Sequence, residues 1–353
     1  MRPDTVQEAS TLLRELGLAS RAIRPVGGGT KPWGVQDGEP LETGGLSRIL
    51  EHNVGDFTAV LEAGVPFAEA QATFASHGQR LAWDPPDPGG ATIGGIVATA
   101  DSGPLRHRYG GVRDLVVGTS VVLSDGTIAK SGGKVIKNVA GYDLAKLFAG
   151  SFGTLGLVAT VSVRLHPLPT DTATVVHEFD DPDALLAKTL ELARRPLEAD
   201  CFDVVWGDGR GRLLVQFSGA AAEEAAKRAG ELADVDWDAV RGLQRSPDGA
   251  VLKVSGRPTD LPDVIRAAGD ATVVSRAALG LSWIAFAPGE DLAERLAATR
   301  QALSPRACTV LDGASRVGDQ WPDPGPSQVV MERLKARFDP ARIFRPGTFV
   351  GGL

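Results

Sequence analysis

Residues 84–103 read DPPDPGGATIGGIVATADSG, residues 108–128 read RYGGVRDLVVGTSVVLSDGTI, and residues 131–169 read SGGKVIKNVAGYDLAKLFAGSFGTLGLVATVSVRLHPLP. In this stretch, small-residue loops alternate with short apolar segments. Two β-branched runs around a Ser-Asp-Gly turn predict a hairpin near residues 116–130. The alternation in LVATVSVRLHPLP predicts a half-buried strand that ends at prolines. Strands linked by glycine-rich loops are the pattern expected where backbone lines a ligand site.

Four loops of small residues recur along the first half of the chain, at 27–30, 88–95, 141–143 and 150–156. The first, Gly-Gly-Gly-Thr, matches neither a P-loop nor a long Rossmann helix opening. Its consecutive N–H groups suit a concave nest for a diphosphate. The second is expected to open a helix at 93–98, where an anion and a flat ring can approach. Taken singly, each loop has the alternative of a tight turn; together they indicate one long ligand.

The composition narrows the class of protein. The chain has 353 residues, of which 43% are hydrophobic, enough for two domains with sizeable cores. A net charge of −7 gives no electrostatic footprint for nucleic acid. Cys201 and Cys308 each stand alone, so iron–sulfur and structural zinc sites within this chain are not expected. Both are predicted to be buried free thiols.

The N-terminus does not have the pattern of a signal peptide, and no membrane-spanning helix is predicted. The first seventeen residues carry charges where a signal peptide needs an apolar core. No apolar run approaches the ~20 residues of a membrane-spanning helix. The sequence therefore predicts a cytoplasmic protein, with any membrane association made through a partner.

The pattern of strand-like and helical segments changes near residue 170. A helix is predicted at 4–18, and strand-like and helical segments alternate over 46–83 in an α/β rhythm. Beyond 170, strand-like runs such as TATVVHEF and RLLVQFSG alternate with helical segments such as DALLAKTLELARR. This part predicts an α+β domain, an antiparallel sheet with helices on one side. The expected domains are 1–170, 171–330 and a C-terminal segment, 331–353, that returns to the first domain.

These motifs resemble a known family. The nest at 27–30, PGGATIGGIVAT with the following Asp-Ser-Gly, RYGGVRD and KNVAGYDLAKLFAGSFGTLGLV are similar to FAD-binding oxidoreductases of the PCMH type, the vanillyl-alcohol-oxidase superfamily. The resemblance implies an α+β fold with a PCMH-type FAD-binding domain of two α/β subdomains and a smaller cap domain. Within the superfamily, the pattern most resembles the FAD-binding E subunits of glycolate oxidase complexes. It covers roughly residues 1–170, and the Phe-Arg-Pro-Gly tail at 344–347 less closely.

The resemblance assigns FAD contacts position by position. It implies that the diphosphate lies in a cradle formed by Gly27, Gly28, Gly29, Thr30 and Lys31. It places along the diphosphate and the isoalloxazine the residues Pro88, Gly89, Gly90, Ala91, Thr92, Gly94, Gly95, Ala98, Ser102 and Gly103. It sets beside the flavin Asn138, Gly141 and Tyr142, and at the adenine end Gly153, Gly156 and Val158. Arg345 stands where relatives have the Asn of an Asn-Pro-Gly near the flavin ring.

Some relatives attach FAD covalently to a histidine just after the glycine nest. Here the nest is followed by Lys31, Pro32 and Trp33, so FAD is expected to be non-covalent. His107 is the other possible attachment point. It lies between two arginines, which favours a surface or pocket-rim position.

The histidines are distributed unevenly. All five occur before residue 178, and none follows in the part expected to face the substrate. Oxidation of a 2-hydroxy acid at a flavin needs a base for the hydroxyl proton, and histidine suits neutral pH. Catalytic relatives carry a late metal-binding HxxGDGN-like motif, whereas residues 311–319 here read LDGASRVGD. The sequence therefore assigns neither a catalytic residue nor a metal site.

Three functional hypotheses follow. The first is the FAD subunit of a glycolate oxidase-like complex that oxidises glycolate or D-lactate, with a catalytic flavin subunit and an iron–sulfur subunit as partners. The second is a stand-alone FAD oxidase or dehydrogenase for another hydroxy acid or alcohol, using a base other than histidine. The third is a non-catalytic assembly subunit that keeps the flavin fold.

Overall fold

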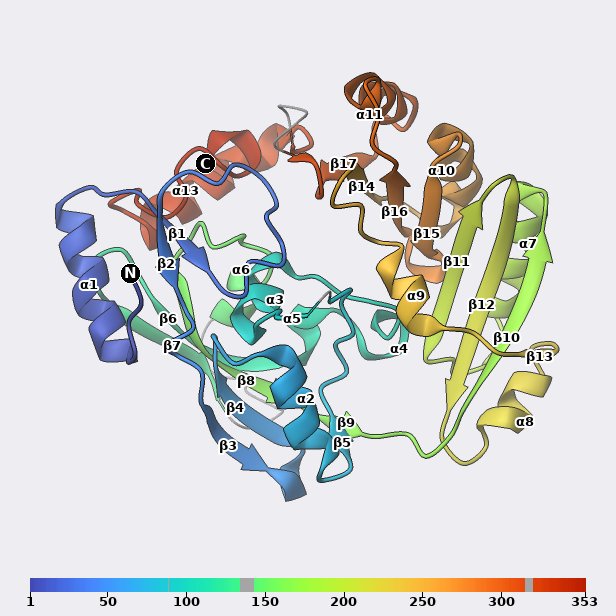
Figure 1. The fold of residues 1–353 in the computed structure, drawn as a ribbon, viewed down its shortest axis with the longest axis horizontal. Coiled ribbons are helices and arrows are strands. Elements are labelled where there is room, and N and C mark those ends of the chain that lie inside the picture. Colours follow the sequence, from blue (N-terminus) through green and yellow to red (C-terminus); the bar gives the residue numbers. More distant parts are fainter. Residues whose placement is uncertain (88, 134–142, 315–319) are drawn as a thin grey trace. The chain divides into compact units, whose positions relative to one another are not determined.

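The computed structural model describes residues 1–87, 89–133, 143–314 and 320–353. The chain forms two compact units (Figure 1). The first unit comprises residues 1–102, 110–168 and 323–353, and the second comprises 103–109 and 169–322. Residues 103–109, expected within the N-terminal domain, thus belong with the second unit.

The first unit is built on a five-stranded antiparallel sheet. Its strands are β3 (Ile49–Asn53), β4 (Thr58–Glu62), β8 (Leu157–Arg164), β6 (Val116–Val122) and β7 (Ile128–Gly132), in that spatial order. The predicted hairpin is confirmed as β6–β7. Gly126 in its turn has a φ of 82°, and the Asp125 carboxylate accepts a hydrogen bond from the Thr127 N–H at 2.8 Å.

Short elements surround this sheet. The predicted N-terminal helix is α1 (Val6–Leu18), capped by the Thr5 hydroxyl, which accepts from the Glu8 N–H. Parallel strands β1 (Ile23–Val26) and β2 (Glu39–Glu42) form a second small sheet, and β5 (Gln79–Arg80) pairs with β9 (His166–Pro167). Further helices are α2 (Phe67–Ala75), α3 (Ile93–Thr99), α5 (Val112–Leu115), α6 (Leu144–Phe148) and α13 (Gln328–Phe338).

The C-terminal segment is an integral part of the first unit. Phe344 forms a parallel bridge with Ile23 on β1, and Ile343 and Phe344 are buried in the same core as α1 and β8. Lys335 on α13 is buried and donates to the carbonyls of Thr154 and Phe344, both at 2.7 Å. Burial lowers the pKa of Lys335, although its ion pair with Asp339 opposes this shift. These contacts hold the chain terminus against β1 and the 150–156 loop.

The second unit is an α+β layer built on an eight-stranded sheet in the order β13-β10-β12-β11-β15-β16-β14-β17. All of its pairings are antiparallel. The strands are β10 (Thr172–Phe179), β11 (Cys201–Gly207), β12 (Arg210–Ser218), β13 (Leu232–Ala233), β14 (Ala250–Ser255), β15 (Thr272–Arg276), β16 (Leu281–Phe286) and β17 (Ala307–Val310). The helices are α4 (Arg106–Tyr109), α7 (Pro182–Ala193), α8 (Ala222–Lys227), α9 (Trp237–Gly242), α10 (Leu261–Ala268) and α11 (Leu292–Ala302).

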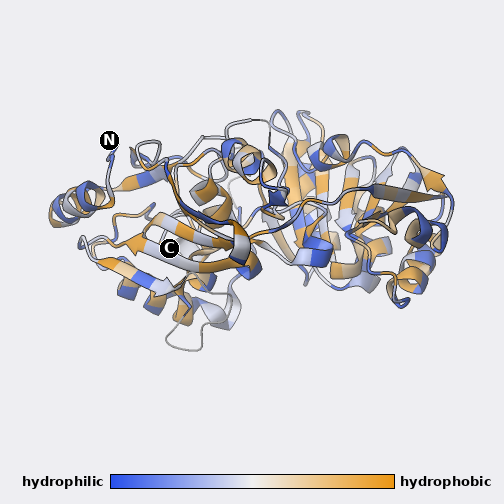
Figure 2. Ribbon diagram, turned by 90° about the horizontal axis from the view of Figure 1, so that it is seen from below, coloured by the Kyte–Doolittle hydropathy of each residue, from blue (hydrophilic) through white to orange (hydrophobic). Residues whose placement is uncertain are grey.

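Apolar side chains cover both faces of this sheet. One face packs against α7, α8, α10 and α11, whose apolar sides join the strand residues in a single large core. Figure 2 shows hydrophilic and hydrophobic residues alternating along the helices and strands of the molecule. The expectation of helices on one side only is incomplete, because Cys201, Val205 and Val274 on the other face pack with Trp237 of α9 and with Leu105.

The predicted α+β fold class is confirmed. Cys201 and Cys308 are free and buried, as predicted. Among the residues described, no helix combines the length and apolar character needed to cross a bilayer.

Candidate cofactor site

The first unit contains a cavity of about 290 Å³, at the lower end of the range for small-molecule sites. Three segments supply most of its wall: the turn after β1, the start of α3 with the residues before it, and the loop that leads into β8. Arg345, from the C-terminal segment, completes it. All lining residues belong to the first unit.

Glycine at 27 and 28 is required by close packing. A Cβ at Gly27 would lie 2.1 Å from the Thr92 hydroxyl oxygen, and one at Gly28 would lie 1.6 Å from the Gly90 carbonyl oxygen. Within the described part of the chain, the N–H groups of Gly27, Gly28 and Gly29 donate to no protein acceptor. Unpaired backbone donors in a concave turn form an anion nest. This cradle fits a diphosphate.

The start of α3 is different from the expected anion site. Its N-cap, Thr92, accepts a hydrogen bond from the Gly95 N–H at 3.3 Å. The N–H groups of Ile93 and Gly94 donate to the carbonyls of Val65 and Ala63 at 3.0 and 2.7 Å. Because these donors are already used within the protein, α3 contributes close approach and not anion binding. Gly94 permits this packing, since a Cβ there would lie 2.6 Å from that of Ala63.

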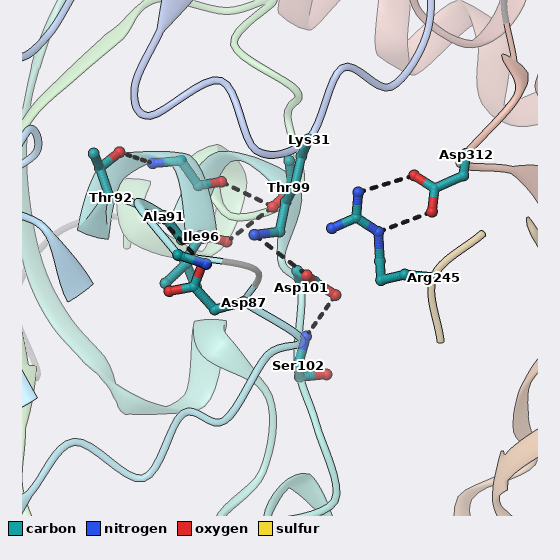
Figure 3. A network of polar contacts seen from close by, with 12 residues as sticks. Lys31, Asp87, Ala91, Thr92, Ile96, Thr99, Asp101, Ser102, Arg245 and Asp312 are labelled. Atoms are coloured by element: carbon teal, nitrogen blue, oxygen red, sulfur yellow. Dashed lines mark hydrogen bonds and ion pairs between the residues drawn. The ribbon is translucent and has the colours of Figure 1, made fainter. Parts of the chain in front are cut away.

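Lys31 is tied to the end of the α3 segment (Figure 3). Its Nζ lies 3.5 Å from Oδ2 of Asp101, and the two side chains are only 5% and 4% exposed. The other carboxylate oxygen of Asp101 accepts from the Ser102 N–H at 3.1 Å. Asp87 fixes the preceding loop, because its Oδ1 accepts from the N–H groups of Gly89 and Ala91. The charge of Lys31 is thus largely balanced inside the protein.

Arg345 is a half-buried cation whose partners are carbonyl groups. It donates to the carbonyl oxygens of Phe152 and Trp33, both at 3.1 Å, and of Val35 at 3.0 Å. Its Nε is buried and has no hydrogen-bond partner among the described residues. Burial, and secondarily the charge of Arg24, lowers the pKa of Arg345. The backbone at Arg345 is left-handed, with a φ of 44°.

The structure brings together most of the residues implied by the family resemblance. Those that line the cavity are Gly27, Gly28, Gly29, Thr30, Lys31, Ala91, Thr92, Gly94, Gly95, Ala98, Gly153, Gly156, Val158 and Arg345. Gly89, Gly90 and Ser102 are not part of its wall, and Gly103 belongs to the second unit. Pro88, Asn138, Gly141 and Tyr142 lie outside the described residues.

The cavity also contains residues that the sequence reading missed. They are Arg24, Pro25, Val26, Pro32, Gln36, Thr43, Ala63, Ile96, Thr99, Phe152 and Leu157. Several of them lie next to a motif described above and could have been predicted from the sequence. Gln36, Thr43 and Ala63 carry no sequence signal, because β-sheet pairing and tertiary packing bring them to the wall.

Tertiary structure also changes the interpretation of the histidines. His107 and His177 both belong to the second unit. The ring of His107 is half-buried and stacks on Phe202, with ring centroids 5.4 Å apart, instead of lying free at the surface. Burial, and then the charge of Arg108, lowers the pKa of His107, while Asp200 opposes the shift. His177 contacts the Ala229 carbonyl through Nε2 at 3.0 Å. The described residues of either unit contain no cluster of three or more acidic, histidine or cysteine side chains suited to a metal ion.

Comparison with known proteins agrees with this cavity. Residues 1–132 match the family described as FAD binding domain. The chain is 31% identical over 279 residues to a D-lactate dehydrogenase of Archaeoglobus fulgidus. The aligned region is 72% of this chain and 62% of that protein. It is 34% identical over 182 residues to the mitochondrial cytochrome D-lactate dehydrogenase of Arabidopsis thaliana, which covers 50% of this chain and 32% of that protein. The chain thus matches less than two thirds of the length of these two relatives.

Two other similarities extend over most of the chain. Glycolate oxidase subunit GlcE of Escherichia coli is 27% identical over 322 residues, which is 88% of this chain and 87% of that subunit. The solved structure of an alkyldihydroxyacetonephosphate synthase superposes with a TM-score of 0.71 at 16% identity, covering 98% of this chain and 75% of that one. The latter supports the fold alone. Residues 1–132 thus form an FAD-binding domain of the predicted PCMH type, with FAD as the cofactor.

Proposed function

We propose that the protein is the FAD-binding subunit of a glycolate oxidase-like complex that oxidises a 2-hydroxy acid, glycolate or D-lactate, to the 2-oxo acid. The observation that carries this proposal is the extent of similarity to the GlcE subunit, which spans 88% of this chain and 87% of that subunit. The chain is also 37% identical to glycolate oxidase subunit GlcD of Bacillus subtilis, but over only 52% of this chain and 40% of that one.

In this proposal the first unit is the FAD-binding domain and the second unit is the cap. The N–H groups of Gly27 to Gly29 hold the diphosphate, and the bonded start of α3 allows the dinucleotide to approach closely. Gly153, Gly156 and Val158 line the wall where the adenine end is expected. FAD supplies hydride acceptance and onward electron transfer when bound. FAD is held without a covalent bond, since Lys31 and Pro32 follow the nest.

The proposed partners follow from what this chain lacks in sequence. Its two cysteines are too few to bind an iron–sulfur cluster, so electrons leave through a partner that carries one. A second flavin subunit accepts the hydride from the hydroxy acid.

The test is an absorption spectrum of the purified chain, before and after anaerobic addition of glycolate or D-lactate. The proposal expects flavin absorbance that stays oxidised with the chain alone and bleaches when the co-expressed partner subunits are present. Bleaching of the isolated chain would identify a stand-alone dehydrogenase. Absence of flavin even after FAD is added would favour a non-catalytic assembly subunit.

A further inference from the structure

The proposed FAD site contains two arginines with no acidic partner. Arg24 and Arg345 both line the cavity. Arg24 donates through Nε to the Gln36 carbonyl at 3.2 Å, and Arg345 donates to three carbonyl groups. Among the described residues, neither guanidinium forms an ion pair with a carboxylate. The cavity wall therefore carries two positive charges that the protein does not balance.

This arrangement is costly without a ligand. Both arginines are half-buried, and partial burial of a cation without a counter-ion is unfavourable because carbonyl dipoles only partly replace hydration. The two guanidinium charges also disfavour each other, which is one cause of the lowered pKa of Arg345. The left-handed backbone at Arg345 adds to the cost, since Asn or Gly adopts it more easily. A bound anion would offset these costs.

We propose that Arg24 and Arg345 recognise the adenosine-diphosphate half of the cofactor by charge, next to the backbone nest at Gly27–Gly29. This inference rests on the proposed FAD site and names the side chains that make the site selective for a diphosphate. The nest supplies neutral N–H donors, and the arginines supply the positive charge that balances the diphosphate. Lys31 does not fill this role, because Asp101 already balances it.

Arg345 also has a structural role that the test must separate. Its guanidinium joins Trp33 and Val35 to Phe152, two segments of the cavity region, so its removal loosens them whether or not it meets a phosphate. Arg24 makes only one such contact. A structural effect does not depend on salt, whereas attraction between charges weakens as ionic strength rises.

The experiment measures the dissociation constants of FAD and of ADP by titration calorimetry, at low and high potassium chloride, for the full-length flavin-free protein. The variants are Arg24→Gln, Arg345→Asn and the double substitution. Arg21→Gln is the matched control, because Arg21 is an exposed arginine paired with Glu39 that does not line the cavity. Circular dichroism checks that each variant is folded.

We expect each single variant to weaken both FAD and ADP about tenfold, and the double variant to bind both with a flatter salt dependence. The control should bind both as the unsubstituted protein does. Unchanged ADP affinity in the Arg24→Gln and Arg345→Asn variants would overturn the inference while leaving the FAD site intact. So would weakened binding with an unaltered salt dependence, which indicates a structural role. If the unsubstituted protein binds no FAD, the proposed function itself has failed.

Discussion

Two arginines, one in each unit, show how differently the two regions use charge. Arg276 on β15 is fully buried and is neutralised by Asp203, also fully buried, at 2.7 Å. It also donates to Gln244 and lies over the ring of Trp283, 4.9 Å from its centroid. Arg345 in the first unit is half-buried and donates to carbonyl groups, without a carboxylate partner among the described residues.

The difference separates structural charge from charge held for a ligand. In the sheet of the second unit, the cation and its counter-ion come from neighbouring antiparallel strands, because Asp203 and Arg276 are paired in register. The pair is complete without any other molecule. In the cavity of the first unit, donors and cations are in excess of acceptors. A bound anion would balance these charges.

The largest expected effect is on the glycine cradle. In Gly28→Val the new side chain would overlap the Gly90 carbonyl, since even a Cβ there lies 1.6 Å from that oxygen. We expect FAD affinity to fall by more than about 100-fold, because backbone must move to relieve the overlap. Titration of the flavin-free protein with FAD measures this. Gly55→Ala, where a Cβ meets no atom within 4 Å, is the control. Retained affinity in Gly28→Val would show that the cavity is not the FAD site.

The next effect is on the stability of the second unit. Arg276→Met leaves the Asp203 carboxylate buried without its cation, so we expect the free energy of unfolding to fall by about 3–5 kcal/mol. Chemical denaturation monitored by tryptophan fluorescence measures this change. Arg266→Met serves as the control, because Arg266 and Asp183 form an exposed pair that contributes roughly 0–1 kcal/mol. A similar loss in both variants would remove the distinction between a structural pair and a surface pair.

The corresponding substitution in the cavity of the first unit is Arg345→Asn. In flavin-free protein, we expect Arg345→Asn to change the free energy of unfolding by no more than about 1 kcal/mol. The loss of hydrogen bonds to carbonyl groups destabilises the fold. Removal of an unbalanced half-buried charge offsets this loss, and Asn also adopts the left-handed backbone more easily than Arg. The same denaturation measurement applies. A loss as large as that of Arg276→Met would mean that Arg345 serves the fold.

At neutral pH the smallest effect comes from His166 in the first unit, because its contribution to stability appears only as the pH falls. Burial, then the charges of Arg164 and Arg80, lowers the pKa of His166 from 6.5 to about 4. The unfolded chain takes up this proton near pH 6.5 and the folded chain only near pH 4, so His166 makes stability fall as pH drops through this window. We expect His166→Gln to show a shallower fall between these values. Equal slopes in thermal melts of the two proteins would exclude this contribution.

Much of the molecule was predictable from local sequence. The β6–β7 hairpin follows from its β-branched runs and Asp-Gly turn, and α1 follows from apolar spacing behind a Thr cap. Most of the cavity residues were also within reach, because the glycine loops that form it are continuous in sequence. The helix start at residue 93 was predicted correctly, but its availability for an anion was not. Hydrogen bonds to the distant carbonyls of Ala63 and Val65 use its donors.

The sequence by itself determined the fold class, the glycine loops and the FAD-binding family, because short-range patterns and motifs encode them. Only the tertiary structure decided which charges balance one another. Lys31 pairs with Asp101, Arg276 pairs with Asp203, and Arg345 lies beside Arg24, although these residues are 70, 73 and 321 positions apart in the sequence. The free energy of a buried charge depends on what lies within a few ångströms of it, and chain folding sets that neighbourhood.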